Sequence, residues 1–269
     1  MYNGEMAAVL TDEITAHLNY LYTFAFRLTG DSHDAEDLAQ EAALKALEKI
    51  DTLNDKTALK SWLRKITVNI YLQKERRKGI VNIQTDETLI KQTKTSSFSP
   101  EETVLIDETV REIQDTCFTV MAAKLTLPQK IVFVTVDIFG AEMKETAELL
   151  GLSEQAGKAL LHRARRNLLI FFRQNCQLLF SDLTGKCTCE SWKKVLEERG
   201  SLKKAVTKEH SSPPFDNPEY LDTELDASAA RILTLFHSMP PRKPDIRWYA
   251  AVTEEIKAFK RIVSVKKTF

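Results

Sequence analysis

Apolar side chains recur every three or four positions along residues 12–78, which is the periodicity of amphipathic α-helices. Gly30 interrupts the pattern, so a first helix ends there and a second helix follows. After a predicted loop over residues 51–57, the pattern predicts a third helix over about 58–78. The first part of the chain is therefore predicted to be a bundle of helices.

The pattern changes over residues 80–100, where Thr and Ser dilute the apolar content and Pro100 closes the stretch, as in a linker. Helical periodicity resumes at Glu101 and continues to about Phe172, and beyond that point it weakens. The sequence predicts an all-α fold of two helical domains joined by a flexible linker, with a C-terminal helical extension: 1–79, the linker 80–100, 101–173 and the extension 174–269.

Composition excludes several classes of protein. Eight glycines and eight prolines in 269 residues fit long helices and argue against a turn-rich β fold. No apolar run approaches the ~20 residues of a membrane span, and Met1–Asp12 lacks the pattern of a signal peptide. Four cysteines in a chain of this length make no disulfide framework, so we expect a reducing, cytoplasmic location. Basic and acidic residues balance at 38 each, which leaves local charge patches as the informative signal.

The second predicted helix is acidic at its start, with five acids and no lysine or arginine between residues 31 and 41. On a helical wheel, six apolar residues from Ala35 to Ala46 form one arc. One interpretation is that these acids complement the helix dipole at the N-terminus and that the rest of the face is solvated. The alternative is a docking surface for a basic partner helix. The acidic side opposite the apolar arc consists of Asp34, Asp37, Glu41 and Glu48, with Gln40 at its margin.

The third predicted helix has the opposite charge. Seven lysines and arginines between residues 60 and 78 stand against one acid, and Trp62, Asn69 and Tyr71 lie among them. Cations bind phosphates and aromatic rings stack on unpaired bases, so this composition suits single-stranded nucleic acid. In the competing interpretation the apolar residues are core and the cations are solvated, and for Trp62 we favour the core.

Residues 143–150, the turn Gly151-Leu152-Ser153 and the helix from Glu154 onward have helix-turn-helix spacing. Ser153 is a suitable N-cap for the second of these helices. That helix carries several basic residues and no acid after Glu154, which suits a major groove or the phosphates beside it. The alternative is a solvated face on an ordinary helical hairpin.

Three stretches resemble one family. Asp34-Ala35-Glu36-Asp37-Leu38-Ala39-Gln40-Glu41, the segment from Trp62 to Asn69 followed by Arg76-Arg77, and Glu145 to Ser153 resemble the second and fourth conserved regions of extracytoplasmic-function (ECF) sigma factors of RNA polymerase, within the sigma-70 family. The resemblance covers about residues 12–173, and no third sigma-type domain intervenes. It implies a subunit that binds core polymerase, directs it to promoter DNA and helps to open the DNA, without enzymatic activity of its own.

The resemblance also implies a role for particular residues. Binding of the clamp helices of the largest polymerase subunit is assigned to Asp34, Glu36, Asp37, Gln40 and Glu41. Melting and holding of the minus-ten element is assigned to Asn69, Lys74, Arg76 and Arg77. Recognition of the minus-thirty-five element, with the later arginines gripping phosphate, is assigned to Lys158, His162, Arg163, Arg165 and Arg166.

One departure from the family pattern lies at the start of the recognition helix, where the usual Thr-Val-Lys is Ala156-Gly157-Lys158. Glycine inside a helix costs about 1 kcal/mol relative to alanine, so we expect weaker or altered minus-thirty-five recognition.

The extension carries two further signals. Cys176, Cys187 and Cys189 could hold zinc with a fourth ligand from His162, His210 or Cys117, although buried free cysteines are the commoner outcome. The family permits cysteine-bearing extensions that sense metal or oxidation, and it permits an anti-sigma partner. An amphipathic stripe suits docking on a partner helix or on the chain's own domains, and self-packing is the commoner outcome. The stripe consists of Tyr249, Val252, Ile256, Phe259 and Val263.

Three functions compete on the sequence. An enzyme is disfavoured because the chain has no Gly-rich phosphate loop, no H-E-x-x-H and no G-x-S-x-G. A stand-alone helix-turn-helix regulator of duplex DNA would have no need of the acidic helix. A third alternative is an interaction protein whose extension is the functional part. We favour the sigma factor, with no catalytic residues, no cofactor other than the zinc considered above, and no membrane partner.

Overall fold

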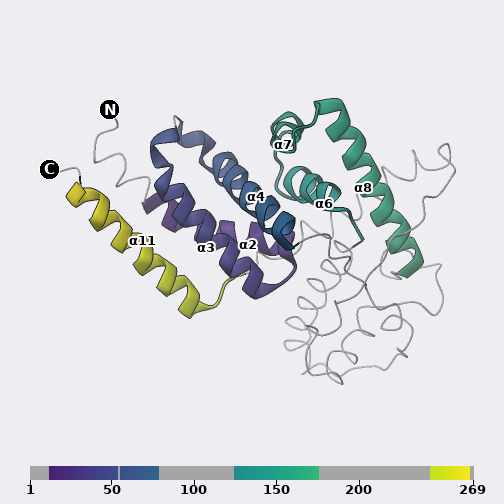
Figure 1. Ribbon diagram of the computed structural model, residues 1–269. Helices are drawn as coiled ribbons and strands as arrows, with labels where there is room; N and C mark the ends of the chain where they lie inside the picture. Colours follow the sequence, from purple (N-terminus) through teal and green to yellow (C-terminus); the bar gives the residue numbers. More distant parts are fainter. Residues whose placement is uncertain (1–11, 54, 79–123, 176–242, 267–269) are drawn as a thin grey trace, which may run out of the picture. The chain divides into compact units, whose positions relative to one another are not determined.

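The computed structural model describes residues 12–53, 55–78, 124–175 and 243–266, and within them the regular elements are all helical (Figure 1). The predicted all-α fold is confirmed for this part of the chain. The helices belong to two compact units, one built from the N-terminal helices with the C-terminal helix and one from the helices between them. The predicted linker 80–100 and most of the extension 174–269 lie outside the described residues.

Three helices form the N-terminal part of the first unit: α2 (Leu18–Thr29), α3 (Ser32–Glu48) and α4 (Leu59–Lys78). The α3 helix packs against both α2 and α4, because its apolar arc faces them. All six residues of the predicted arc are fully buried, as are Phe24 of α2 and Leu63 of α4. The predicted loop between α3 and α4 contains two short 3-10 turns, η1 (Ile50–Thr52) and η2 (Lys56–Ala58).

The junction between α2 and α3 is fixed by local hydrogen bonds. Gly30 ends α2 in the left-handed conformation, at φ 72°, which glycine adopts without steric cost. The Asp31 side chain then caps α3 by accepting hydrogen bonds from the backbone N–H groups of His33 (2.8 Å) and Asp34 (3.1 Å). The buried Tyr71 hydroxyl donates to the Leu28 carbonyl at 2.9 Å, which ties α4 to the end of α2.

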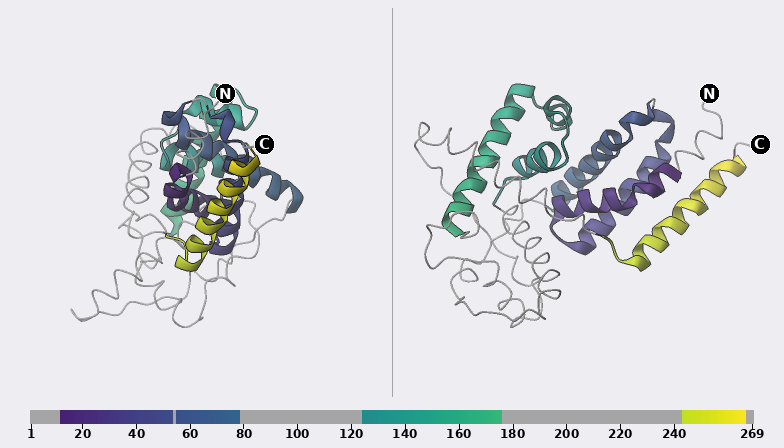
Figure 2. Two further views of the ribbon diagram at one scale, coloured as in Figure 1. Left: turned by 90° about the vertical axis from the view of Figure 1, so that its left-hand side faces the viewer. Right: turned by 180° about the vertical axis from the view of Figure 1, so that it is seen from behind.

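The C-terminal helix α11 (Ile246–Lys266) belongs to the same unit and packs against α3 (Figures 1 and 2). Its apolar stripe faces the bundle: Val252 and Ile256 are 1% and 0% exposed. The Trp248 ring lies 5.7 Å, centre to centre, from the Tyr22 ring of α2. The self-packing expected for this stripe is therefore confirmed for Val252 and Ile256.

The second unit contains α6 (Leu127–Val132), the π-helix η5 (Phe133–Ile138), α7 (Met143–Leu149) and α8 (Glu154–Asn175). The predicted turn between α7 and α8 is present. Gly151 has φ 70° and the Ser153 hydroxyl accepts a hydrogen bond from the Ala156 N–H at 3.2 Å, as an N-cap does. The sequence pattern did not predict the π-helix, because a single widened turn hardly changes apolar periodicity.

Candidate functional site

The exposed side of α3 is acidic, as its pattern predicts. Asp34, Asp37, Glu41 and Glu48 are all exposed, while the opposite arc of the helix is buried. Glu36 and Gln40 are intermediate in exposure and lie toward one edge of this side. The five residues assigned to polymerase binding therefore form one continuous patch, which we call the acidic face: Asp34, Glu36, Asp37, Gln40 and Glu41.

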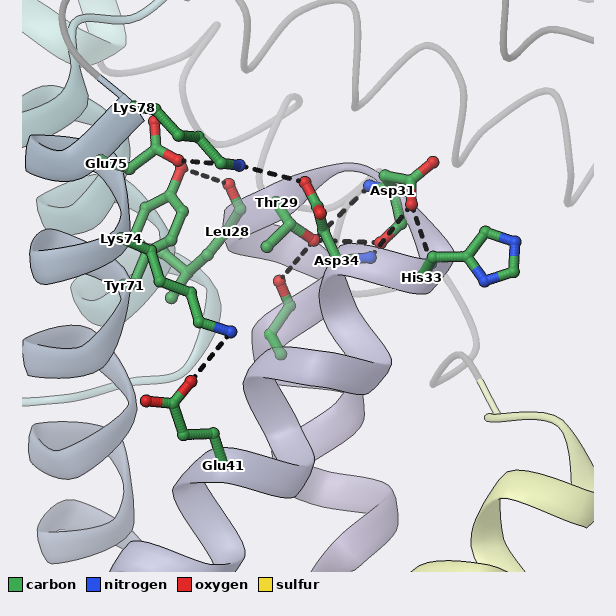
Figure 3. Close-up of polar contacts among 11 residues, drawn as sticks. Leu28, Thr29, Asp31, His33, Asp34, Glu41, Tyr71, Lys74, Glu75 and Lys78 are labelled. Atoms are coloured by element: carbon green, nitrogen blue, oxygen red, sulfur yellow. Dashed lines mark hydrogen bonds and ion pairs between the residues drawn. The ribbon is translucent and has the colours of Figure 1, made fainter.

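Two lysines of α4 reach this face from the neighbouring helix (Figure 3). Lys74 forms an ion pair with Glu41 at 3.0 Å, and Lys78 forms one with Asp34 at 3.3 Å. Lys78 also pairs with Glu75, one turn earlier on α4, at 3.4 Å. Lys74, which the resemblance assigns to DNA, is thus paired with an acid that the resemblance assigns to polymerase.

The charges around Lys78 favour the protonated form of this lysine. Partial burial works against the charge of Lys78, but the carboxylates of Asp34 and Glu75 outweigh it and the pKa of Lys78 is raised. The neighbouring Tyr71 is 4% exposed, and its burial, reinforced by Glu75 and Asp34, raises the pKa of its hydroxyl far above the ordinary value. Tyr71 therefore stays neutral and serves as a hydrogen-bond donor.

The other edge of the acidic face contacts α11. The Gln40 side-chain amide donates a hydrogen bond to Glu255 of α11 at 2.9 Å. The phenol of Tyr249, also on α11, lies 3.5 Å from the Thr15 carbonyl oxygen, near the start of the same unit. Gln40 thus joins Asp34 and Glu41 among the residues assigned to polymerase that already have a partner within the chain.

The outward side of α4 presents polar and basic groups in one row. Lys65, Asn69, Gln73 and Arg76 are exposed at helical spacings of four, four and three residues, and Arg77 is exposed beside them. Trp62, on the same side, is half-buried and so is neither the core residue that we favoured nor a fully open ring. Lys65 and Gln73 were absent from the assigned set, although their spacing from Asn69 was enough to find them.

The outward side of α8 is basic near its middle. His162 and Arg163 are exposed and Arg166 is partly exposed, while Leu161, Ala164 and Leu168 face inward. Lys158 is exposed and forms an ion pair with Glu154 at 2.7 Å. Gln155 lies on the same outward side, near the helix start, and was not among the assigned residues.

Arg165 differs from the other assigned cations of α8. Its guanidinium donates two hydrogen bonds to Asp137 of the π-helix, at 2.8 Å and 2.6 Å, and the Asp137 side chain is 3% exposed. A bidentate arginine–carboxylate pair is the strong form of such a contact. Arg165 therefore neutralises a buried acid and joins α8 to η5.

Gly157 is buried against α7. A Cβ added at this position would lie 2.8 Å from the Met143 sulfur and 3.0 Å from the Ala147 Cβ. The departure from the family pattern at this position thus has a packing cause, which is close approach of the two helices of the helix-turn-helix motif. Gly157 therefore lowers the intrinsic helix stability of α8, and it also allows α7 to approach α8 closely.

The cysteines proposed as zinc ligands, Cys176, Cys187 and Cys189, lie outside the described residues. Within the described ranges, no group of three or more His, Cys, Asp or Glu side chains could hold a metal ion. In the same ranges, the helices are too short or too polar to cross a membrane.

One family match lies within each of the two units. Residues 14–79 match Sigma-70 region 2, and residues 116–168 match Sigma-70, region 4. The first match contains α2, α3 and α4, and the second contains α6, η5, α7 and the first two thirds of α8. The helix α11 lies beyond both matches.

Several curated relatives are ECF RNA polymerase sigma factors. The chain is 28% identical over 169 residues to the ECF RNA polymerase sigma factor SigE of Mycolicibacterium smegmatis, covering 61% of this chain and 63% of that protein. It is 32% identical to SigJ of Mycobacterium tuberculosis, covering 57% and 48%, and 27% identical to SigX of Bacillus subtilis, covering 61% and 81%. The chain thus spans less than two thirds of the length of the first of these relatives.

One solved structure is similar over 61% of this chain and 96% of its own, with a TM-score of 0.41 and 20% identity: the sigma factor RpoE in complex with the anti-sigma factor NepR from Bartonella quintana.

Two helical units that match regions 2 and 4 of one family, in that order along the chain, define a member of the sigma-70 family of RNA polymerase sigma factors. The relatives place this chain in the ECF type of that family.

Proposed function

We propose that this protein is a promoter-specificity subunit that binds core RNA polymerase through the acidic face of α3. The observation that carries the proposal is the segregation of charge on one helix: Asp34, Asp37 and Glu41 are exposed, and the arc behind them is fully buried. Asp34 and Glu41 also pair with lysines of α4, but those pairs are solvated and contribute little to folding, whereas an exposed acidic stripe complements a basic partner helix. The proposed partner is the pair of clamp helices in the largest polymerase subunit, as the resemblance implies.

The α4 helix then holds the non-template strand of the minus-ten element. Its outward row combines the cations Lys65 and Arg76 with the amides Asn69 and Gln73, which suits unpaired bases and their phosphates. Lys74 can bind this strand only after its ion pair with Glu41 breaks. Because the Glu41 side chain is half-exposed, breaking that pair costs little free energy.

The α8 helix binds the minus-thirty-five duplex. His162, Arg163 and Arg166 face outward and grip phosphate, while Gln155 and Lys158 near the helix start meet base edges. We assign Arg165 a supporting role through Asp137 in place of the phosphate contact first expected. The location proposed for this activity is the cytoplasm, and neither a catalytic role nor a cofactor is part of the proposal.

The deciding experiment mixes the protein with core polymerase and a pool of random promoter fragments, and it maps transcript start sites. We expect start sites that share minus-ten and minus-thirty-five sequences and that are missing without the protein. A stand-alone helix-turn-helix regulator would bind duplex fragments without polymerase and produce no new start sites.

A matched pair of variants tests the acidic face itself. Asp37→Lys should weaken core binding at least about tenfold, because it sets a cation against a basic partner. Glu48→Lys makes the same charge change on the same exposed side of α3, three turns away and outside the assigned patch, and it should leave binding within about twofold. Equal core affinity for the two variants, measured by fluorescence titration, would remove the acidic face from the proposal.

A further inference from the structure

The helix α11 lies along one edge of the surface that the proposed function needs for polymerase. It lies outside the family-matched residues 14–79, yet it packs against the helix that carries the acidic face. Its contacts fall on the edge of α3 that contains Gln40 and on Tyr22 of α2. The bundle thus meets another helix of its own chain at the margin of the surface where a partner helix is expected to dock.

The contact has an apolar centre and a polar rim, as helix-in-groove interfaces do. Val252 and Ile256 of α11 are fully buried one helical turn apart, with the half-buried Trp248 one turn before them. At the rim, Gln40 donates to Glu255. On the outer side of α11, Glu254 and Lys257 pair with each other at 2.7 Å and are 69% and 55% exposed.

Two features make this docking weak enough to reverse. The indole N–H of Trp248 is buried and has no hydrogen-bond partner among the described residues, which costs free energy. When α11 undocks, this N–H can donate a hydrogen bond to water. Glu255 brings a carboxylate to a helix whose exposed side is already acidic, and the neutral Gln40 amide holds it there.

We infer that α11 is a built-in competitor of the polymerase, which must displace it from α3 to bind fully. The inference rests on the proposed function. Because α11 is tethered to the bundle, its docking is an intramolecular step, so a modest contact suffices to keep it docked. The apparent affinity for polymerase is then reduced by the fraction of molecules in which α11 is undocked.

The first test undocks α11 in the full-length chain. Ile256→Asp places a charge in the buried centre of the contact, whereas Ala258→Asp places the same charge two residues away on the exposed side of the same helix. We expect Ile256→Asp to bind core polymerase at least about fivefold more tightly than wild type, and Ala258→Asp to match wild type. Unchanged or weaker binding by Ile256→Asp would overturn the inference, since weaker binding would make α11 part of the polymerase-binding surface.

The second test needs no variant. Hydrogen exchange of the full chain is followed by mass spectrometry with and without core polymerase. We expect the amides of α11 to exchange faster in the complex while those of α3 exchange more slowly, because polymerase displaces α11 from the edge of α3 and protects α3 itself. Slower or unchanged exchange in α11, with α3 protected, would overturn the inference and leave the proposed function standing. Failure of the proposed function would instead show as no polymerase binding by any of the chains and no protection of α3.

Discussion

The two basic helices of the molecule, α4 and α8, hold their cations in opposite ways. On α4, Lys74 and Lys78 reach acids of α3 across a partly exposed surface, with side chains 31% and 52% exposed. On α8, Arg165 grips Asp137, whose side chain is 3% exposed. A cation in a solvated pair changes partner at little cost, whereas one that neutralises a buried acid does not. Counting basic residues therefore overstates how many cations of α8 are available to a binding partner.

The largest expected effect breaks the buried pair. Arg165→Ala leaves the carboxylate of Asp137 buried without its guanidinium, which should destabilise the second unit by about 3 kcal/mol, at the low end for a broken buried pair because Arg165 is 32% exposed. Urea denaturation followed by circular dichroism measures the change. Arg163→Ala, at an exposed position of the same helix, should stay within about 0.5 kcal/mol. A loss below about 1 kcal/mol for Arg165→Ala would mean that Asp137 finds other partners.

The second effect concerns how closely α8 meets α7. Gly157→Val adds side-chain atoms where a single Cβ already lies 2.8 Å from the Met143 sulfur, so we expect about 2 kcal/mol of destabilisation from overpacking. Ala159→Val, at an exposed position of α8, gives the cost of a β-branched residue alone, about 0.5 kcal/mol. Thermal unfolding of the two variants should separate these values. Equal losses would show that α7 yields to the added atoms.

The third effect lies on α4. Tyr71→Phe removes the buried hydroxyl that donates to the Leu28 carbonyl at 2.9 Å, and the loss should be about 1 kcal/mol, with the ring packing retained. Urea denaturation again measures it. Tyr20→Phe makes the same chemical change at a side chain that accepts a hydrogen bond from Arg64 at 2.8 Å, and it serves as a comparison for a less buried hydroxyl. A larger loss at Tyr20 than at Tyr71 would contradict the prediction.

The smallest effect is expected at the solvated pairs. A double-mutant cycle with Lys74→Ala and Glu41→Ala should give a coupling of no more than about 0.5 kcal/mol that fades with added salt.

The pKa of Lys78 is raised from its ordinary 10.5, so its pairing contributes below that pH and is lost as the pH rises through the higher folded pKa. Stability from this pair should therefore be constant between about pH 6 and 9. A coupling above about 1.5 kcal/mol between Lys74 and Glu41 would show that this pair behaves like the buried Arg165–Asp137 pair of α8 and not like a solvated one.

Local patterns were enough to predict most of the fold. The breaks at Gly30 and Gly151, the N-cap at Ser153 and the buried arc of α3 follow from residue type and helical spacing, which act over a few residues. The π-helix could not be predicted, because a widened turn is stabilised by tertiary contacts such as the one between Asp137 and Arg165.

The candidate site was less predictable for the same reason. Spacing placed Asp34, Asp37 and Glu41 on one exposed side, but it could not show that Lys74 pairs with Glu41 or that Arg165 binds a buried acid. Nor could it show where the apolar stripe of α11 would dock, since any apolar groove satisfies such a stripe. Which charges are available to a partner depends on contacts between residues far apart in the chain.

The position of α11 late in the sequence also has a consequence during synthesis of the protein. The α4 helix ends at residue 78 and α11 begins at residue 246, so the ribosome must add more than 160 residues between the two. At roughly 5–20 residues per second, that takes about 10–30 s. During this interval a nascent chain has a complete α2–α4 bundle and no α11, and it should bind core polymerase as readily as the Ile256→Asp variant does.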